Sequence, residues 1–219
     1  MYFQKDYILR MIEMMGDMMR RIFELLDDLQ RMRMLNDAAK KYCGINLDAA
    51  NKLSAESLVD MLSPQPRLMM AEILYIQACA IKPDEERKPI AYYKIVKLLL
   101  SLKEESLLCE IRYERLLECI EACDVQLSSQ DYLDAAMFML EAEQFAYSED
   151  IIYRGIDAVS IAPEEYKAYL QQAIELMSGC LQITDERLII GGLPRDEVTE
   201  SVDTLQRKLS AAKQEPSIL

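Results

Sequence analysis

The chain has 219 residues, of which 51% are hydrophobic, and it contains only 6 Gly and 7 Pro. This composition favours helices over a β-rich or disordered chain, and the length allows one large domain or a domain with an appendage. The net charge is −13, of which residues 63–219 carry −12. Because an acidic surface repels phosphate groups, we expect neither a nucleic-acid partner nor an anionic membrane partner.

A long helix is predicted first, from about Asp6 to about Lys41. Apolar residues recur in it at spacings of four and three, which is a heptad pattern. We call them the heptad stripe: Ile8, Ile12, Met15, Met19, Ile22, Leu26 and Leu29. Burying each such side chain is worth about 1.5–3 kcal/mol, so the stripe should be covered. We predict that it docks on the chain's own helices or forms the main self-association or partner-binding element.

Capping signals predict two short helices after this one. Gly44 is suited to end the long helix, and Asn46 or Asp48 restarts the chain. Ser54 is an internal cap, and Ser63–Pro66 is the clearest linker. The sequence therefore divides into residues 1–62, the methionine-rich helix with its connector, and residues 63–219, a helical-repeat domain.

Seven or eight antiparallel helices with short loops are predicted for residues 66–213. Their starting signals are Pro66, Pro89, Ser101, Ser128, Ser148, Pro163, Thr184 and Pro194. Ser101 with Glu104 and Ser128 with Asp131 have the spacing of capping boxes. Gly191 and Gly192 are interpreted as a helix break, because no phosphate-loop motif surrounds them.

The stretch LEAEQFAYSEDIIYRGIDAVSIAP resembles a tetratricopeptide repeat. A helix that ends at Phe145 would be followed by a second helix with Gly155 and Ala158 and by a closing Pro163. The resemblance implies antiparallel helix pairs stacked in a right-handed superhelix. An ordinary helical bundle is the alternative.

The N-terminal motif FQKDYILRMIE, followed by a long apolar helix and paired helices, resembles an uncharacterised family of Gram-positive bacterial proteins that is known as a domain of unknown function. This resemblance covers nearly the whole chain. It implies a helical, tetratricopeptide-like protein, and it supplies no activity, cofactor or catalytic residue.

The absence of histidine excludes Ser-His-Asp and Cys-His nucleophiles and histidine-based zinc sites. No cysteine pair has C-x-x-C spacing, so we expect buried thiols in a reducing cytoplasm, with neither metal nor other cofactor. These cysteines are Cys43, Cys79, Cys109, Cys119, Cys123 and Cys180. Four glutamates on one helix, Glu110, Glu114, Glu118 and Glu121, are interpreted as a solvated strip rather than an acid–base pair.

Two functions fit these observations. The first is a helical-repeat scaffold or adaptor that binds a protein or peptide partner and can self-associate through the heptad stripe. The alternative is an enzyme, or an enzyme's regulatory subunit, that uses carboxylate or tyrosine chemistry. The tyrosines of the repeat region would fill the core or line a peptide groove. We favour the interaction protein and do not expect an enzyme.

Overall fold

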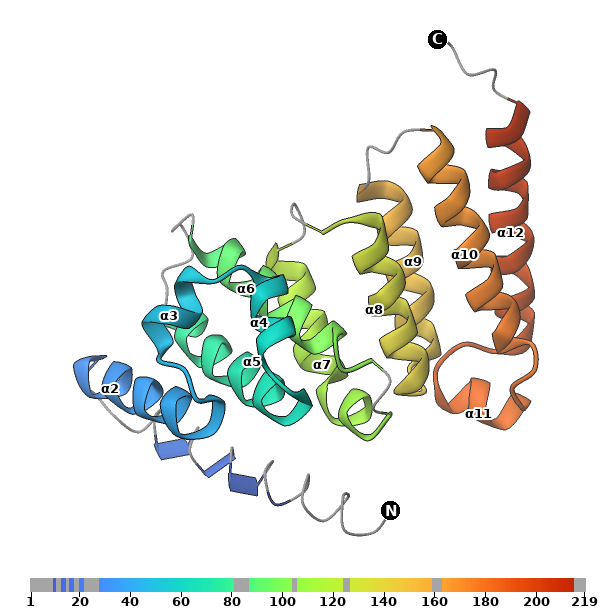
Figure 1. Cartoon of the computed structure of the whole chain (residues 1–219). Helices are drawn as coiled ribbons and strands as arrows, with labels where there is room; N and C mark the ends of the chain where they lie inside the picture. The colour runs from blue at the N-terminus through green and yellow to red at the C-terminus, as the bar shows by residue number, and fades with distance from the viewer. Residues whose placement is uncertain are drawn as a thin grey trace. The chain divides into compact units, whose positions relative to one another are not determined.

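The computed structural model is all-α over the residues that it describes, which confirms the all-helical part of the predicted fold class. The described residues are 10, 13–14, 16–17, 20–21, 28–80, 87–103, 106–123, 127–158 and 163–214. In chain order the helices are α2 (Asp28–Ala38), the π-helical turn η1 (Ala39–Cys43), α3 (Leu47–Lys52), α4 (Ala55–Met61), α5 (Pro64–Cys79), α6 (Arg87–Leu100), α7 (Ser106–Cys123), α8 (Ser129–Glu141), α9 (Phe145–Ala158), α10 (Pro163–Cys180), α11 (Asp185–Ile190) and α12 (Arg195–Gln214) (Figure 1). No helix in these ranges is long and apolar enough to cross a membrane.

Local side-chain chemistry sets several helix ends where the sequence predicts them. Gly44 follows η1 with φ of 74°, a left-handed conformation that glycine adopts without a steric penalty. The Asn46 side chain accepts a hydrogen bond from the Ala49 N–H, and Ser54 caps α4 in the same way. Ser128 and Asp131 form the predicted capping box at the start of α8.

Other boundaries differ from the prediction because a side chain bonds elsewhere. The Ser101 hydroxyl donates to the Leu98 carbonyl, so Ser101 belongs to the end of α6, and α7 begins at Ser106. Phe145 begins α9, whereas the sequence pattern placed it at the end of the preceding helix. Ser148, predicted as a helix start, lies inside α9, where its buried hydroxyl donates to the Ala136 carbonyl of α8 at 3.0 Å.

The chain forms two compact units. Unit 1 comprises Met1–Leu102 and Glu118–Gln126, and unit 2 comprises Lys103–Leu117 and Leu127–Leu219. In unit 1, α5 packs against α6, α2 and η1, and α4 packs against α6. The Lys94 ammonium of α6 is buried and donates to the Asn51 carbonyl at 2.6 Å, which satisfies the end of α3. The expected domain boundary between residues 62 and 63 falls inside unit 1.

Unit 2 is built around α8, α9, α10 and α12, and α11 connects α10 to α12 along the chain (Figure 1). A turn of three residues joins α8 to α9, and the two helices run antiparallel. Gly155 of α9 lies against Tyr132 of α8 and Tyr169 of α10, so closely that a Cβ there would overlap both side chains. The Tyr169 hydroxyl donates to the Ile152 carbonyl at 2.9 Å. Both tyrosines are fully buried in the core, whereas Tyr147 of α9 is 43% exposed, so the tyrosines of the repeat region do not all fill the core.

Candidate functional site

The heptad stripe falls largely outside the part of the chain that the structure describes. Ile8, Ile12, Met15, Met19, Ile22 and Leu26 lie outside the described residues. Leu29 of α2 is described, and its side chain is 70% exposed. The stripe's role in docking or self-association therefore stays a prediction.

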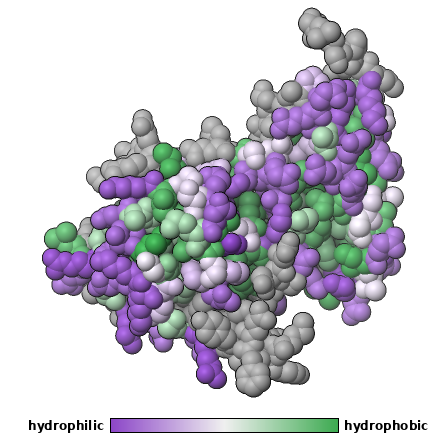
Figure 2. All heavy atoms as spheres, in the orientation of Figure 1, coloured by the Kyte–Doolittle hydropathy of each residue, from purple (hydrophilic) through white to green (hydrophobic). Residues whose placement is uncertain are grey.

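A second candidate site lies in unit 2, where the last turns of α8 and α10 meet α11. These elements enclose an open cleft of about 480 Å³, which we call the acidic cleft. Its apolar walls come from Leu140, Phe145, Leu176 and Ile183. Figure 2 shows that hydrophobic and hydrophilic side chains both reach the surface of the molecule on the face drawn.

Close backbone packing fixes one end of the acidic cleft. Glu143, in the turn between α8 and α9, has φ of 56°, which is unusual for a residue other than glycine. The Ala146 N–H donates to the Gly191 carbonyl at 3.1 Å. A Cβ at Gly191 would overlap the Phe145 ring and the Glu143 carbonyl oxygen, so only glycine allows α11 to approach this turn.

An ion pair joins the same two segments through their side chains. The Arg187 guanidinium of α11 lies 2.7 Å from the Glu143 carboxylate, and both side chains are about half exposed. Exposed ion pairs of this kind contribute little to stability. At the acidic cleft, Glu143 neutralises the positive charge of Arg187, which is the one cation among the residues that line the cleft.

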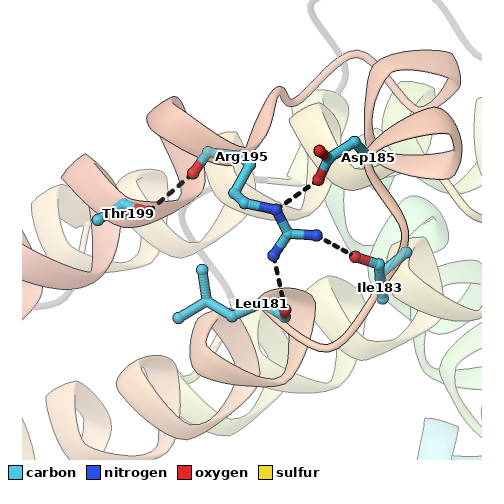
Figure 3. A network of polar contacts seen from close by, with 5 residues as sticks. All are labelled: Leu181, Ile183, Asp185, Arg195 and Thr199. Atoms are coloured by element: carbon cyan, nitrogen blue, oxygen red, sulfur yellow. Dashed lines mark hydrogen bonds and ion pairs between the residues drawn. The ribbon is translucent and has the colours of Figure 1, made fainter.

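Arg195, the first residue of α12, holds the link between α10 and α11 in place (Figure 3). Its guanidinium donates to the Leu181 carbonyl at 2.6 Å, to the Ile183 carbonyl and to the Asp185 carboxylate. Three acceptors spread around one planar group fix the path of the backbone between them. Arg195 therefore positions Ile183, which forms part of the cleft wall.

The electrostatics of the acidic cleft are negative. Glu141, Glu143 and Glu175 supply three carboxylates, and Arg187 supplies one cation. Both α8 and α10 end at the cleft, and neither has a basic residue in its last turn. The Arg195 guanidinium binds the Leu181 carbonyl directly after α10 and compensates that helix end. Because a helix C-terminus carries a partial negative charge, the end of α8 adds to the negative potential of the carboxylates.

The cysteines and the glutamate strip have the environments of structural residues. Five of the six cysteines are buried, as predicted, but Cys79 is exposed because it lies in the last turn of α5, where the core ends. Burial raises the pKa of Cys180, at the acidic cleft, to about 11, so its thiol stays protonated at neutral pH. All members of the glutamate strip on α7 are exposed, which confirms that the strip is solvated. In the described part of the chain, no three Cys, Asp or Glu residues are placed to hold a metal ion.

Sequence reasoning missed the acidic cleft. Its lining residues come from four helices and are spread from residue 140 to residue 187, so no short motif contains them. One signal was nevertheless present in the sequence. The last turns of two long helices, α8 and α10, lack a basic residue, and each helix carries a glutamate near its C-terminal end, Glu141 and Glu175.

The comparisons with known proteins bear on the whole chain. The model of a protein family matches residues 2–210. No curated protein and no solved structure matches the chain.

Proposed function

The chain belongs to that family, the family of unknown function DUF6483, and we propose that it is an interaction protein that binds a segment of a protein partner in the acidic cleft. The observation that carries this proposal is the cleft itself, in which apolar walls and carboxylates face the same open space. Binding sites combine a mainly apolar surface with a few polar groups that fix the orientation of the ligand. The proposed role is binding, as a scaffold or adaptor, and not catalysis.

The finer architecture belongs to the same proposal. We propose that α5 with α6, α8 with α9, and α10 with α12 are pairs stacked in a tetratricopeptide-like way. Each pair packs extensively within its own unit, and Gly155 provides the close helix approach that such stacking uses. A bacterial source and a cytoplasmic location complete the proposal. The five buried, free thiols suit a reducing compartment.

Gly179 offers a direct test of the acidic cleft. It lines the cleft in the last turn of α10, and a Cβ built on it meets no atom within 4 Å. In Gly179→Phe a ring would therefore occupy space that is open in the wild type. Replacing a helical glycine also favours the helix, so the variant should fold. Ala211→Phe adds the same ring at an exposed position of α12 and serves as the control.

Peptides selected from a random display library on the wild-type protein would be the probe. We expect Gly179→Phe to weaken their binding by about tenfold or more, which corresponds to about 1.4 kcal/mol, and Ala211→Phe to leave it unchanged. Fluorescence anisotropy with labelled peptides measures both, and circular dichroism checks that the variants are folded. Failure to select any peptide, or equal binding by both variants, would refute the proposed site.

A further inference from the structure

We infer that the acidic cleft takes a lysine or arginine side chain of the partner segment, with an apolar residue of the same segment packed on α11. This inference rests on the proposed function and specifies the chemistry of the partner. It follows from the charge of the cleft, from its apolar walls and from the exposed surface beside it.

The acidic cleft is lined by more carboxylates than cations. Arg187 is paired with Glu143, so its positive charge does not offset that of Glu175. Glu175 has no ion pair within the described ranges, and its side chain is exposed at the rim. The C-terminal end of α8, which has no basic residue in its last turn, adds negative potential at the same place. An incoming ammonium or guanidinium group would meet a carboxylate and one helix end of complementary charge.

The acidic cleft also has an apolar surface beside its carboxylates. Leu140, Phe145 and Leu176 line the acidic cleft together with its glutamates. A metal ion keeps a shell of water or oxygen ligands and gains nothing from such walls. Lysine and arginine instead carry their charge on a stem of methylene groups that packs on apolar surface. The combination of walls and carboxylates therefore fits a basic side chain.

An exposed apolar residue of α11, Ile190, lies next to the acidic cleft. Ile190 lies three residues after Arg187, so both side chains are on one side of α11. Ile190 is 76% exposed, and Arg187 lines the cleft. An apolar residue close to the basic residue of the partner segment would cover Ile190. Ile189, which is 64% exposed, projects about 100° away around the helix and serves as a matched control.

The test uses the peptides selected on the wild-type protein. We expect the enriched peptides to contain a lysine or arginine next to apolar residues. Replacing lysine by norleucine, or arginine by citrulline, removes the charge and keeps most of the stem. Each replacement should weaken binding by about tenfold or more, as expected for a charge that loses its partner.

Protein variants complete the test. Glu175→Lys should weaken binding by about tenfold or more, whereas Asp203→Lys, which makes the same charge change on an exposed position of α12, should weaken it less than about twofold. Ile190→Ser should weaken binding more than Ile189→Ser does. Equal effects of Glu175→Lys and Asp203→Lys would indicate general attraction to an acidic protein and would overturn the inference.

The outcomes separate the inference from the proposed function. Acidic or purely apolar peptides that are lost in Gly179→Phe would leave the acidic cleft as a binding site and refute its basic ligand. Peptides that bind Gly179→Phe as well as they bind the wild type would refute the cleft itself.

Discussion

Glu149 of α9 is a half-buried carboxylate in an acidic neighbourhood. Burial raises its pKa above the ordinary value of 4.5, and the negative charges of Asp150, Glu197 and Glu200 raise it further. The hydroxyl of Ser201, which donates to the carboxylate, acts in the opposite direction. At neutral pH the ionised form of Glu149 therefore opposes folding.

The sign of the pH dependence follows from this raised pKa. Protonation of Glu149 stabilises the folded state, and that contribution is present at low pH and lost as the pH rises through the folded-state pKa. We expect Glu149→Gln to be more stable than the wild type at neutral pH, with a difference that shrinks as the pH falls to 4.5 and below. Urea unfolding across this range measures it, with Asp203→Asn as the control for loss of a charge. A constant difference at every pH would contradict the prediction.

Gly191 and Gly179 are two glycines of unit 2 with opposite surroundings. A Cβ at Gly191 would overlap the Phe145 ring and the Glu143 carbonyl, whereas a Cβ at Gly179 meets nothing within 4 Å. We expect Gly191→Ala to destabilise the protein by about 1–3 kcal/mol through overpacking. Gly179→Ala should stabilise it by about 0.5–1 kcal/mol, because alanine favours the helix. Urea unfolding of both variants compares them, and equal effects would show that the approach of α11 is not tight.

At the scale of elements, the N-terminal heptad stripe is predicted either to dock on the chain's own helices or to mediate self-association or partner binding, and its variants distinguish these roles. Leu29, its last member, is 70% exposed on α2, while Leu35 and Ala38 on the same helix are buried. We expect the double variant Met15→Glu, Ile22→Glu to have a smaller mass in solution than the wild type, because a charge within an apolar seam opposes pairing.

Light scattering measures that mass, and circular dichroism reports whether the variant stays folded. Leu29→Glu is a milder variant at a position known to be exposed, so it should lower the association without unfolding the chain. A folded double variant with the mass of the wild type would rule out self-association through this stripe.

At the scale of the whole molecule, the cysteines report the integrity of both units. Cys43, Cys119 and Cys123 are buried in unit 1, and Cys109 and Cys180 are buried in unit 2. Burial raises the pKa of Cys43 to about 12, so its reactive thiolate form is rare at neutral pH.

We expect a thiol reagent to modify Cys79 rapidly in the folded protein, because it is the exposed cysteine, and the five buried ones only after unfolding in urea. A colorimetric thiol reagent counts the sites, and mass spectrometry of the labelled peptides assigns them to each unit. Cys79→Ser should remove the fast phase. A fast phase that survives in that variant would show that a buried thiol is accessible.

The sequence alone determined the helical class and those helix ends that depend on near neighbours. Gly44, Asn46, Ser54 and the Ser128–Asp131 capping box act on backbone groups two to four residues away, so their effect can be derived without knowledge of the fold. The exposed glutamate strip on α7 follows from helical spacing for the same reason.

Only the tertiary structure decided which helix faces which. Ser148 looks like a helix start in the sequence, but α8 supplies a carbonyl for its hydroxyl, and the residue is buried inside α9. Gly155 and Gly191 are required by tyrosine and phenylalanine rings that lie between 14 and 46 residues away in the sequence. The acidic cleft likewise exists because four helices, α8 to α11, converge. Periodicity identifies an apolar face of a helix, but the packing partner of that face depends on contacts between residues distant in the chain.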